Sequence, residues 1–302
     1  MDQQVNIGDL TLKNPVIAAS GTFGYGLEYG SFFDVSELGG ICSKGLSLAP
    51  RAGNPPPRIR ETSAGMLNAI GLANIGVEAF CEDKLPKLRE LGATVIPNIF
   101  ATSIEDFVTL AKRLDREQGI AAVEVNISCP NVTKGGLEFG IDPAAAAAVT
   151  RAVRDATKHP VWVKLSPEAG RVADVARACE EAGADALSAI NTIRGLSIDV
   201  ETWLPHLANR TGGLSGPAIK PIAVRMVWEV CQAVRIPVIG VGGISTAADA
   251  IEFMLAGATA VQVGSASFRD PMATINVAKG ISAYCERKGL HARELTGKAI
   301  LG

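Results

Sequence analysis

The sequence is poor in the residues and motifs that mark metalloproteins, secreted proteins and membrane proteins. Its three histidines are far apart, which gives little support to a histidine metal site. Its six cysteines include no CxxC pair and no iron–sulfur ligand set, so reduced thiols are expected. No apolar run approaches the ~20 residues that cross a bilayer, and no basic segment precedes an apolar one near the start. We therefore expect a cytoplasmic protein with no signal peptide and no membrane span.

Charge is also low and evenly scattered. The net charge of −2 gives no reason to expect a nucleic acid or an anionic membrane as a partner. With 302 residues, 47% of them hydrophobic, the chain can bury a large core. This length suits one α/β barrel, a fold that commonly takes ~250 residues and more with insertions.

Eight short apolar segments alternate with helical patterns along the chain, at residues 15–18, 40–44, 94–100, 120–127, 160–165, 186–190, 237–241 and 260–263. Continuously apolar strands of this kind are typical of buried parallel sheets. The pattern predicts a (β/α)8 TIM barrel, forming a single domain over residues 1–302. An N-terminal β-hairpin at 5–12 would plug one end of the barrel.

Three segments fall outside the strand–helix alternation. A short helix is expected at 28–38. Residues 47–74 and 193–216 are expected to form long loops at the C-terminal face, and loops of such length in a compact domain are usually functional or disordered. Because the stretch 65–72 is too apolar for disorder, we interpret the first loop as a binding loop.

Polar residues gather where the predicted strands end, which is the face where barrel enzymes place their active sites. They are Ser20, Lys44, Asn98, Asn126, Cys129, Lys164, Asn191 and Thr192.

The stretch from Asn126 to Gly136 carries the clearest chemical signal. Cys129 stands between Asn126 and Asn131, and Pro130 biases it away from helical dihedrals. Asparagine amides can recognise a planar amide or imide, and an activated thiol can take a proton. A buried structural cysteine is the better interpretation of an isolated Cys, but here the flanking residues favour function.

Glycine turns follow the last two predicted strands. Gly242-Gly243 and Gly264-Ser265 each precede a helix, so their backbone N–H groups suit one phosphate. Turns in any barrel also need glycine, but two adjacent turns after the last strands favour phosphate binding.

Lys44, Asn98 and Lys164 are polar residues in otherwise apolar strands. The two lysines have no acidic residue on their own strands, and a buried cation suits a cofactor that becomes anionic, such as a reduced isoalloxazine. The alternative for Lys164 is an ion pair with Glu124 on an adjacent strand. Asn98 is either a ligand at a strand end or a satisfied core amide.

Three segments together resemble the dihydroorotate dehydrogenase family of class 1: Asn126–Asn131, Gly65–Leu72 and Gly53–Arg58. Asn191-Thr192 followed by Thr211–Pro221 resembles the NAD-linked class 1B catalytic subunit, with the fumarate-linked class 1A as the alternative. The membrane-bound class 2 enzymes carry serine as base and an N-terminal extension, and this chain shows neither.

The resemblance implies FMN as the cofactor of this barrel and two sets of binding residues, with no metal. The residues implied to hold FMN are Ser20, Gly21, Lys44, Asn98, Asn126, Lys164, Ile190, Gly216, Gly242, Gly243, Gly264 and Ser265. Those implied to bind the substrate are Lys44, Asn68, Ala69, Ile70, Gly71, Leu72, Asn126, Asn131, Asn191 and Thr192.

The implied reaction is the oxidation of dihydroorotate to orotate in pyrimidine synthesis. Cys129 would take the C5 proton while a hydride leaves C6 for the flavin, and Lys164 would stabilise the reduced flavin. A loop at 130–140 could close over the substrate. This chain lacks iron–sulfur ligands and a Rossmann fingerprint, so it is not expected to use NAD alone. The resemblance implies a partner, an iron–sulfur flavoprotein electron-transfer subunit with FAD and a 2Fe-2S cluster, in a heterotetramer of two catalytic and two electron-transfer subunits.

Two interpretations from other classes use the same residues. A flavin-free barrel lyase or isomerase could bind a phosphorylated substrate at the glycine turns and use Lys164 as a Schiff-base amine. A scaffold barrel would need no polar cluster at its mouth, so the residues at the strand ends argue against it.

Overall fold

The computed structural model describes residues 1–128 and 139–299, and its central feature is a parallel sheet closed into a barrel. Within these residues the sheet order is β7-β4-β3-β15-β14-β11-β10-β9-β8. The strands are β3 Val16–Ala18, β4 Gly40–Cys42, β7 Val95–Ile96, β8 Asn98–Ile99, β9 Val123–Asn126, β10 Val161–Lys164, β11 Ala186–Ala189, β14 Val238–Val241 and β15 Ala260–Val263.

The barrel closes through one interrupted strand. β7 pairs with β4 and β8 pairs with β9, and Pro97 alone separates the two halves. Proline has no N–H for the ladder, which explains an interruption at this residue. Counting β7 and β8 as one strand gives eight, so the predicted (β/α)8 TIM barrel is confirmed.

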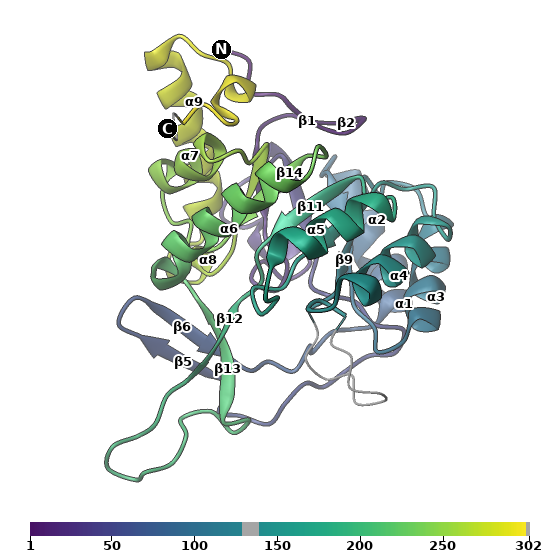
Figure 1. Ribbon diagram of the computed structural model, residues 1–302, viewed down its shortest axis with the longest axis vertical. Helices are drawn as coiled ribbons and strands as arrows, with labels where there is room; N and C mark the ends of the chain where they lie inside the picture. Colours follow the sequence, from purple (N-terminus) through teal and green to yellow (C-terminus); the bar gives the residue numbers. More distant parts are fainter. Residues whose placement is uncertain (129–138, 300–302) are drawn as a thin grey trace.

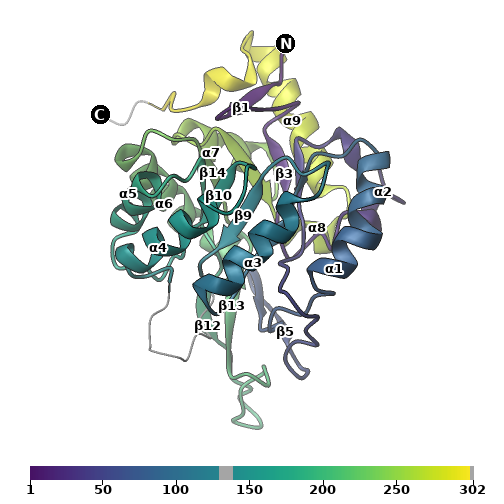
Figure 2. The same cartoon turned by 90° about the vertical axis from the view of Figure 1, so that its right-hand side faces the viewer.

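Helices surround the sheet on its outer side (Figures 1 and 2). The longer ones are α2 Leu85–Glu90, α3 Ile104–Asp115, α4 Pro143–Arg154, α5 Val172–Glu181, α6 Lys220–Ala233, α7 Ala247–Leu255 and α9 Ala273–Lys288. Shorter turns are α1 Val77–Ala79, η3 Phe80–Lys84, η4 Pro217–Ile219, α8 Ala266–Arg269 and η5 Ala292–Leu295.

Helix α3 illustrates how the sequence fixes the outer ring. Phe107, Leu110, Ala111 and Leu114 recur at helical spacing and are buried against the barrel. The side chain of Ser103 accepts a hydrogen bond from the backbone N–H of Asp106, as its N-cap position predicts. No helix in the described part of the chain is both long and apolar enough to cross a membrane.

The two ends of the barrel are covered differently (Figures 1 and 2). The hairpin β1 Val5–Ile7 with β2 Leu10–Leu12 lies at one end, as predicted. The opposite end carries an antiparallel sheet in the order β12-β13-β6-β5. Its strands are β5 Ile59–Thr62, β6 Gly65–Asn68, β12 Ile193–Leu196 and β13 Thr211–Ser215. The two expected long loops are therefore partly strands, which pair with each other through β6 and β13.

The helix expected at 28–38 is wrong. The chain forms two separate 3₁₀ turns there, η1 Leu27–Tyr29 and η2 Val35–Glu37. Gly30, a weak helix former, ends the first turn, and the Asp34 side chain accepts from the N–H of Ser36 to start the second.

Candidate active site

The parallel register brings the polar strand ends together at one face of the barrel. Lys164, the last residue of β10, is the direct partner of Asn126 on β9 and of Ser188 on β11. Asn98 on β8 is the partner of Glu124 on β9. Because parallel strands end at the same edge, these residues form one cluster at the mouth and upper interior of the barrel.

Glu124 is the centre of this cluster. Its carboxylate is fully buried and accepts hydrogen bonds from Asn98 Nδ2 at 2.7 Å and Ser188 Oγ at 2.7 Å. Gln262 Nε2, at 2.6 Å, and Cys42 Sγ, at 3.1 Å, also donate to it. The ion pair between Lys164 and Glu124 left open by the sequence is present, with Nζ 3.9 Å from Oε1.

The charge state of Glu124 follows from these contacts. Burial by itself would raise the pKa of this carboxyl, but the charge of Lys164 and the hydrogen bonds from Gln262, Ser188 and Cys42 outweigh it and lower the pKa. Burial, and then the neighbouring Glu124 charge, raise the pKa of the Cys42 thiol well above its usual range. Both shifts favour an ionised carboxylate beside a protonated thiol.

Only one of the two polar side-chain atoms of Asn98 has a hydrogen-bond partner among the described residues. Its Nδ2 group donates to Glu124, while its Oδ1 is buried without a hydrogen-bond partner among the described residues. A Cβ added at Gly45 would come within 2.9 Å of that Oδ1. A buried acceptor with no protein donor fits a ligand that supplies an N–H group.

Lys44 is the second cation at the mouth. Burial lowers the pKa of its ammonium, and the positive charges of Arg58 and Lys164 lower it further. A Cβ built on Gly21, a residue with φ of +90°, would lie 3.8 Å from Nζ of Lys44. Two lysines with one paired carboxylate leave a net positive site, which suits an anionic ligand.

The glycine turns after β14 and β15 lie side by side because these strands pair directly, with Val241 opposite Gln262. Gly243 has φ of +75°, and a Cβ there would lie 2.7 Å from the carbonyl oxygen of Gly216. Around Gly264 the nearest atom to an added Cβ is 3.6 Å away. The N–H group of Ile190 donates to the carbonyl of Val241 at 2.9 Å, which brings the end of β11 to the same turns.

The residues implied to bind the substrate form a linked series. Asn191 Nδ2 donates to Asn126 Oδ1 at 3.3 Å, and the Asn191 Oδ1 accepts from the N–H of Thr192 at 2.8 Å. Asn68 Nδ2 donates to the carbonyl of Gly213 at 3.3 Å. A Cβ on Gly213 would lie 2.0 Å from Thr192 Oγ1. Because glycine has no Cβ, the Thr192 side chain can pack against Gly213, the residue whose carbonyl Asn68 contacts.

The loop that follows Asn68 is fixed by the Pro- and Gly-rich segment before it. The N–H of Ala69 donates to the carbonyl of Arg58, and Asn54 contacts Ile70 through its N–H and Ala69 through Nδ2. Gly71 and Leu72 both have positive φ, at 72° and 60°. Hydrogen bonds to the preceding segment therefore hold the backbone of the binding loop that was inferred from sequence.

Two predicted residues, Cys129 and Asn131, lie outside the described residues, as does most of the predicted lid at 130–140. The chain reaches them from the site: Ser128 donates from its N–H to Asn126 Oδ1 at 3.1 Å. The hydroxyl of Ser128 donates to the carbonyl of Lys164 at 3.4 Å.

Three members of the buried cluster were not predicted from the sequence: Cys42, Ser188 and Gln262. Gln262 stands in an otherwise apolar strand, Ala260–Val263, as Asn98 and Lys164 do in theirs. That signal alone would have included it. Cys42 and Ser188 are small enough to pass as ordinary core residues.

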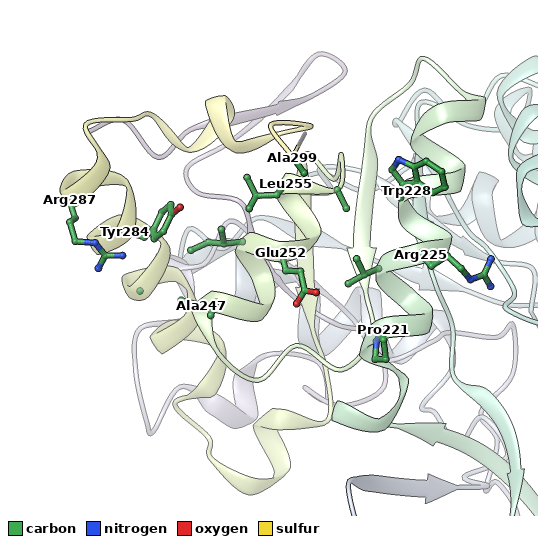
Figure 3. A pocket seen from close by; sticks show the side chains of 14 residues that line it. Pro221, Arg225, Trp228, Ala247, Glu252, Leu255, Tyr284, Arg287 and Ala299 are labelled. Atoms are coloured by element: carbon green, nitrogen blue, oxygen red, sulfur yellow. The ribbon is translucent and has the colours of Figure 1, made fainter. Parts of the chain in front are cut away.

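A separate groove of about 820 Å³ lies on the outer ring between α6, α7 and α9 (Figure 3). Pro221, Trp228, Leu255 and Tyr284 are among its lining residues, and none of the predicted site residues lines it. Among the described residues no group of three or more His, Cys, Asp or Glu side chains could hold a metal ion.

Comparison with known proteins decides the family. The sequence profile of dihydroorotate dehydrogenase matches residues 3–284. The chain belongs to the dihydroorotate dehydrogenase family. It is 55% identical to a protein of Geotalea uraniireducens (strain Rf4), with 99% of this chain and 98% of that protein covered. It is 56% identical to one of Geobacter sulfurreducens, with 98% and 97% covered.

Both relatives are named dihydroorotate dehydrogenase B (NAD(+)), catalytic subunit. The family expected from the sequence is thus confirmed, and the NAD-linked type is favoured over the fumarate-linked alternative. The words "catalytic subunit" indicate that those proteins work with a second subunit.

Proposed function

We propose that this chain is the FMN-carrying catalytic subunit of an NAD-linked dihydroorotate dehydrogenase, which oxidises dihydroorotate to orotate in de novo pyrimidine synthesis. We also propose that residues 1–302 act as one FMN-binding barrel domain in the cytoplasm. The observation that carries the proposal is the cluster at the mouth: two lysines, the unpartnered acceptor of Asn98 and the amides of Asn126 and Asn191 meet where parallel strands end.

The residues fit a flavin with a phosphate tail. The unpartnered Oδ1 of Asn98 can accept from the isoalloxazine ring, and Lys164 and Lys44 supply positive charge beside it. The phosphate would lie at Gly242, Gly243, Gly264 and Ser265, with Gly216 and Ile190 at the same turns and Ser20 and Gly21 beside Lys44. When bound, FMN accepts the two electrons and the hydrogen that leave C6 of dihydroorotate.

The substrate would lie between the asparagine side chains at the mouth and the binding loop at residues 65–72. Asn68, Asn126 and Asn191, with Asn131, would hold the pyrimidine amides and the carboxylate, and Thr192 and residues 69–72 would close the sides. Cys129 would take the proton from C5 of the substrate. The thiol must release that proton to solvent before the next turnover.

The electrons then leave the chain through a partner. From the resemblance to the NAD-linked class we infer an iron–sulfur flavoprotein subunit that carries FAD and a 2Fe-2S cluster and reaches NAD. Two catalytic and two electron-transfer subunits would form the complex. The names of the relatives, which include both NAD(+) and "catalytic subunit", support a second subunit and NAD as the acceptor.

Anaerobic stopped-flow absorbance of the isolated chain tests the proposal. Dihydroorotate should bleach the flavin, and neither fumarate nor NAD should restore the colour without the partner. Rapid reoxidation by fumarate would assign the chain to the fumarate-linked class. A protein that carries no FMN, or whose FMN is not bleached, would refute the assigned reaction.

A further inference from the structure

One carboxylate at the centre of the barrel contacts five other strands. Glu124 lies on β9 and contacts side chains from β4, β8, β10, β11 and β15, which are Cys42, Asn98, Lys164, Ser188 and Gln262. Every one of these side chains is buried. An ionised carboxylate offers about four lone-pair sites. The four hydrogen bonds therefore satisfy it without a direct hydrogen bond from the ammonium of Lys164.

The Lys164 ammonium keeps its N–H donors free of Glu124. Its Nζ is 3.9 Å from Oε1 of Glu124, which is an ion-pair distance and too long for a hydrogen bond. The carboxylate therefore attracts the ammonium and neutralises part of its charge, while the N–H donors are left for a ligand at the mouth. Asn126, beside Lys164 in register, lies at that same mouth.

The geometry at Asn98 shows a second effect. An ionised carboxylate only accepts hydrogen bonds, so the amide must turn its NH₂ group to Glu124. Its oxygen is then directed to the other side, next to Gly45 and the Phe100 ring, where an added Cβ at Gly45 would lie 2.9 Å from it. A flipped amide would set its oxygen against the carboxylate and would leave the NH₂ group without that acceptor.

We propose that Glu124 is a positioning residue for the flavin site: from the barrel centre it holds the Lys164 ammonium in place and fixes which way the Asn98 amide faces. The inference rests on the proposed function, because it concerns the ring that Lys164 and Asn98 would contact. Glu124 itself lies below the mouth and acts through these two side chains.

The competing interpretation is a carboxylate that only holds the barrel together. It predicts that losing Glu124 lowers the stability of the fold, with no effect on the electronic properties of a flavin that still binds. The two interpretations are separated by the reduction potential of bound FMN, because a cation beside the ring favours the charge that the ring gains on reduction.

The test uses the FMN-loaded chain and the Glu124→Gln variant, which keeps the shape but loses the charge and adds a donor. Without its counter-ion the Lys164 ammonium is no longer held in position, and the Asn98 amide is free to turn. We expect the potential to become more negative. At a fixed ratio of dihydroorotate to orotate, the ratio of reduced to oxidised FMN should fall by about tenfold or more, as for the loss of one hydrogen bond to a charged group.

A double-mutant cycle assigns the effect to Lys164. In a Lys164→Met background the Glu124→Gln change should shift the potential by less than it does in the wild type, since one of the two positioned groups is gone. Thr150→Val is the matched control, because Thr150 is equally buried but lies in the outer ring, where its hydroxyl bonds the carbonyl of Ala146 in α4 and the Cys179 thiol of α5. It should leave the potential unchanged.

An unchanged or more positive potential in a Glu124→Gln protein that binds FMN would overturn the inference, as would an equal shift with and without Lys164. If Glu124→Gln does not fold, Glu124→Asp carries the test: it keeps the charge one methylene further away and should give a smaller shift in the same direction. A wild-type chain without FMN would refute the proposed function, whereas a wild-type chain with FMN and an unaffected variant would refute only the role of Glu124.

Discussion

Nδ2 of Asn191 lies 3.3 Å from Oδ1 of Asn126, and this contact joins the end of β9 to the segment that follows β11. The Oδ1 of Asn191 is held in turn by the N–H of Thr192. Both polar side-chain atoms of Asn191 thus have protein hydrogen-bond partners. Such preorganisation keeps two amides in one orientation at the mouth of the barrel.

Asn191→Ala should therefore weaken substrate binding. We expect KM for dihydroorotate to rise about 10- to 100-fold, the loss of one or two hydrogen bonds, with FMN content nearly unchanged. Steady-state kinetics and the flavin absorbance measure both. Asn209→Ala, at an exposed asparagine that contacts Thr211, is the matched control and should behave as wild type. An unchanged KM for Asn191→Ala would remove this residue from the substrate site.

Cys129→Ala should keep FMN but lose most of its reduction by substrate. Loss of a general base typically costs about 10²- to 10⁴-fold, and reduction in the wild type should speed up toward alkaline pH as the thiolate fraction rises. Single-turnover bleaching by dihydroorotate from pH 6 to 10 measures this. The proposed role is wrong if Cys129→Ala is reduced at the wild-type rate.

Gly243→Ala should abolish or strongly weaken FMN binding. The residue has φ of +75°, and the new methyl group would lie 2.7 Å from the carbonyl oxygen of Gly216. Gly289→Ala has a similar φ of +67° but no atom within 4 Å of its Cβ, so it controls for backbone strain alone. Fluorescence titration of the apoprotein with FMN compares them. Equal affinity in the two variants would argue against a phosphate site at this turn.

Asp249→Asn should lower stability in a pH-dependent way. Burial raises the pKa of this carboxyl, but hydrogen bonds from Lys220, Ser245 and Thr246 outweigh burial and lower it. A carboxyl whose pKa is lower in the folded than in the unfolded chain stabilises fully above the unfolded value of about 3.9. That stability is lost as the pH falls through the folded pKa.

The measurement for Asp249 is urea unfolding from pH 7 down to pH 3. At pH 7 the variant should lose about 1 kcal/mol, as for a helix N-cap interaction, and the gap from wild type should narrow progressively as the pH falls below about 4. Asp155→Asn, at an exposed residue that follows α4, should show no gap at either pH. A gap that does not depend on pH would show that the carboxylate charge is not the cause.

Local signals predicted the barrel well. Apolar runs marked all eight strands. Ser103, Asp142 and Thr246 are residue types that favour the N-cap, and in the structure their side chains accept from the N–H of the third residue of the helix that follows. The same logic failed at 28–38, where Gly30 and Asp34 break the helix into two turns. A periodic pattern of apolar residues does not reveal that a single glycine can end a helix.

The pairing of strands far apart in the chain could not be predicted from the sequence. Asn68 and Gly213 are partners in the antiparallel sheet although 145 residues separate them, and neither segment shows the pairing in its own pattern. The cluster around Glu124 was partly predictable, since polar residues in apolar strands pointed to Asn98 and Lys164. The convergence of six strands on one carboxylate depends on barrel register, which a linear pattern does not contain.

At the Glu124 carboxylate, selection for stability and selection for activity favour different residues. Replacing a buried ion pair by apolar side chains of similar volume is often neutral or raises stability. A laboratory screen that rewards only heat resistance would therefore tend to replace Glu124, Lys164 and Gln262 with aliphatic residues, and would select a more durable barrel with no electron-transfer chemistry. Stabilising this protein for practical use requires these positions to be held constant while the helices and the outer surface are varied.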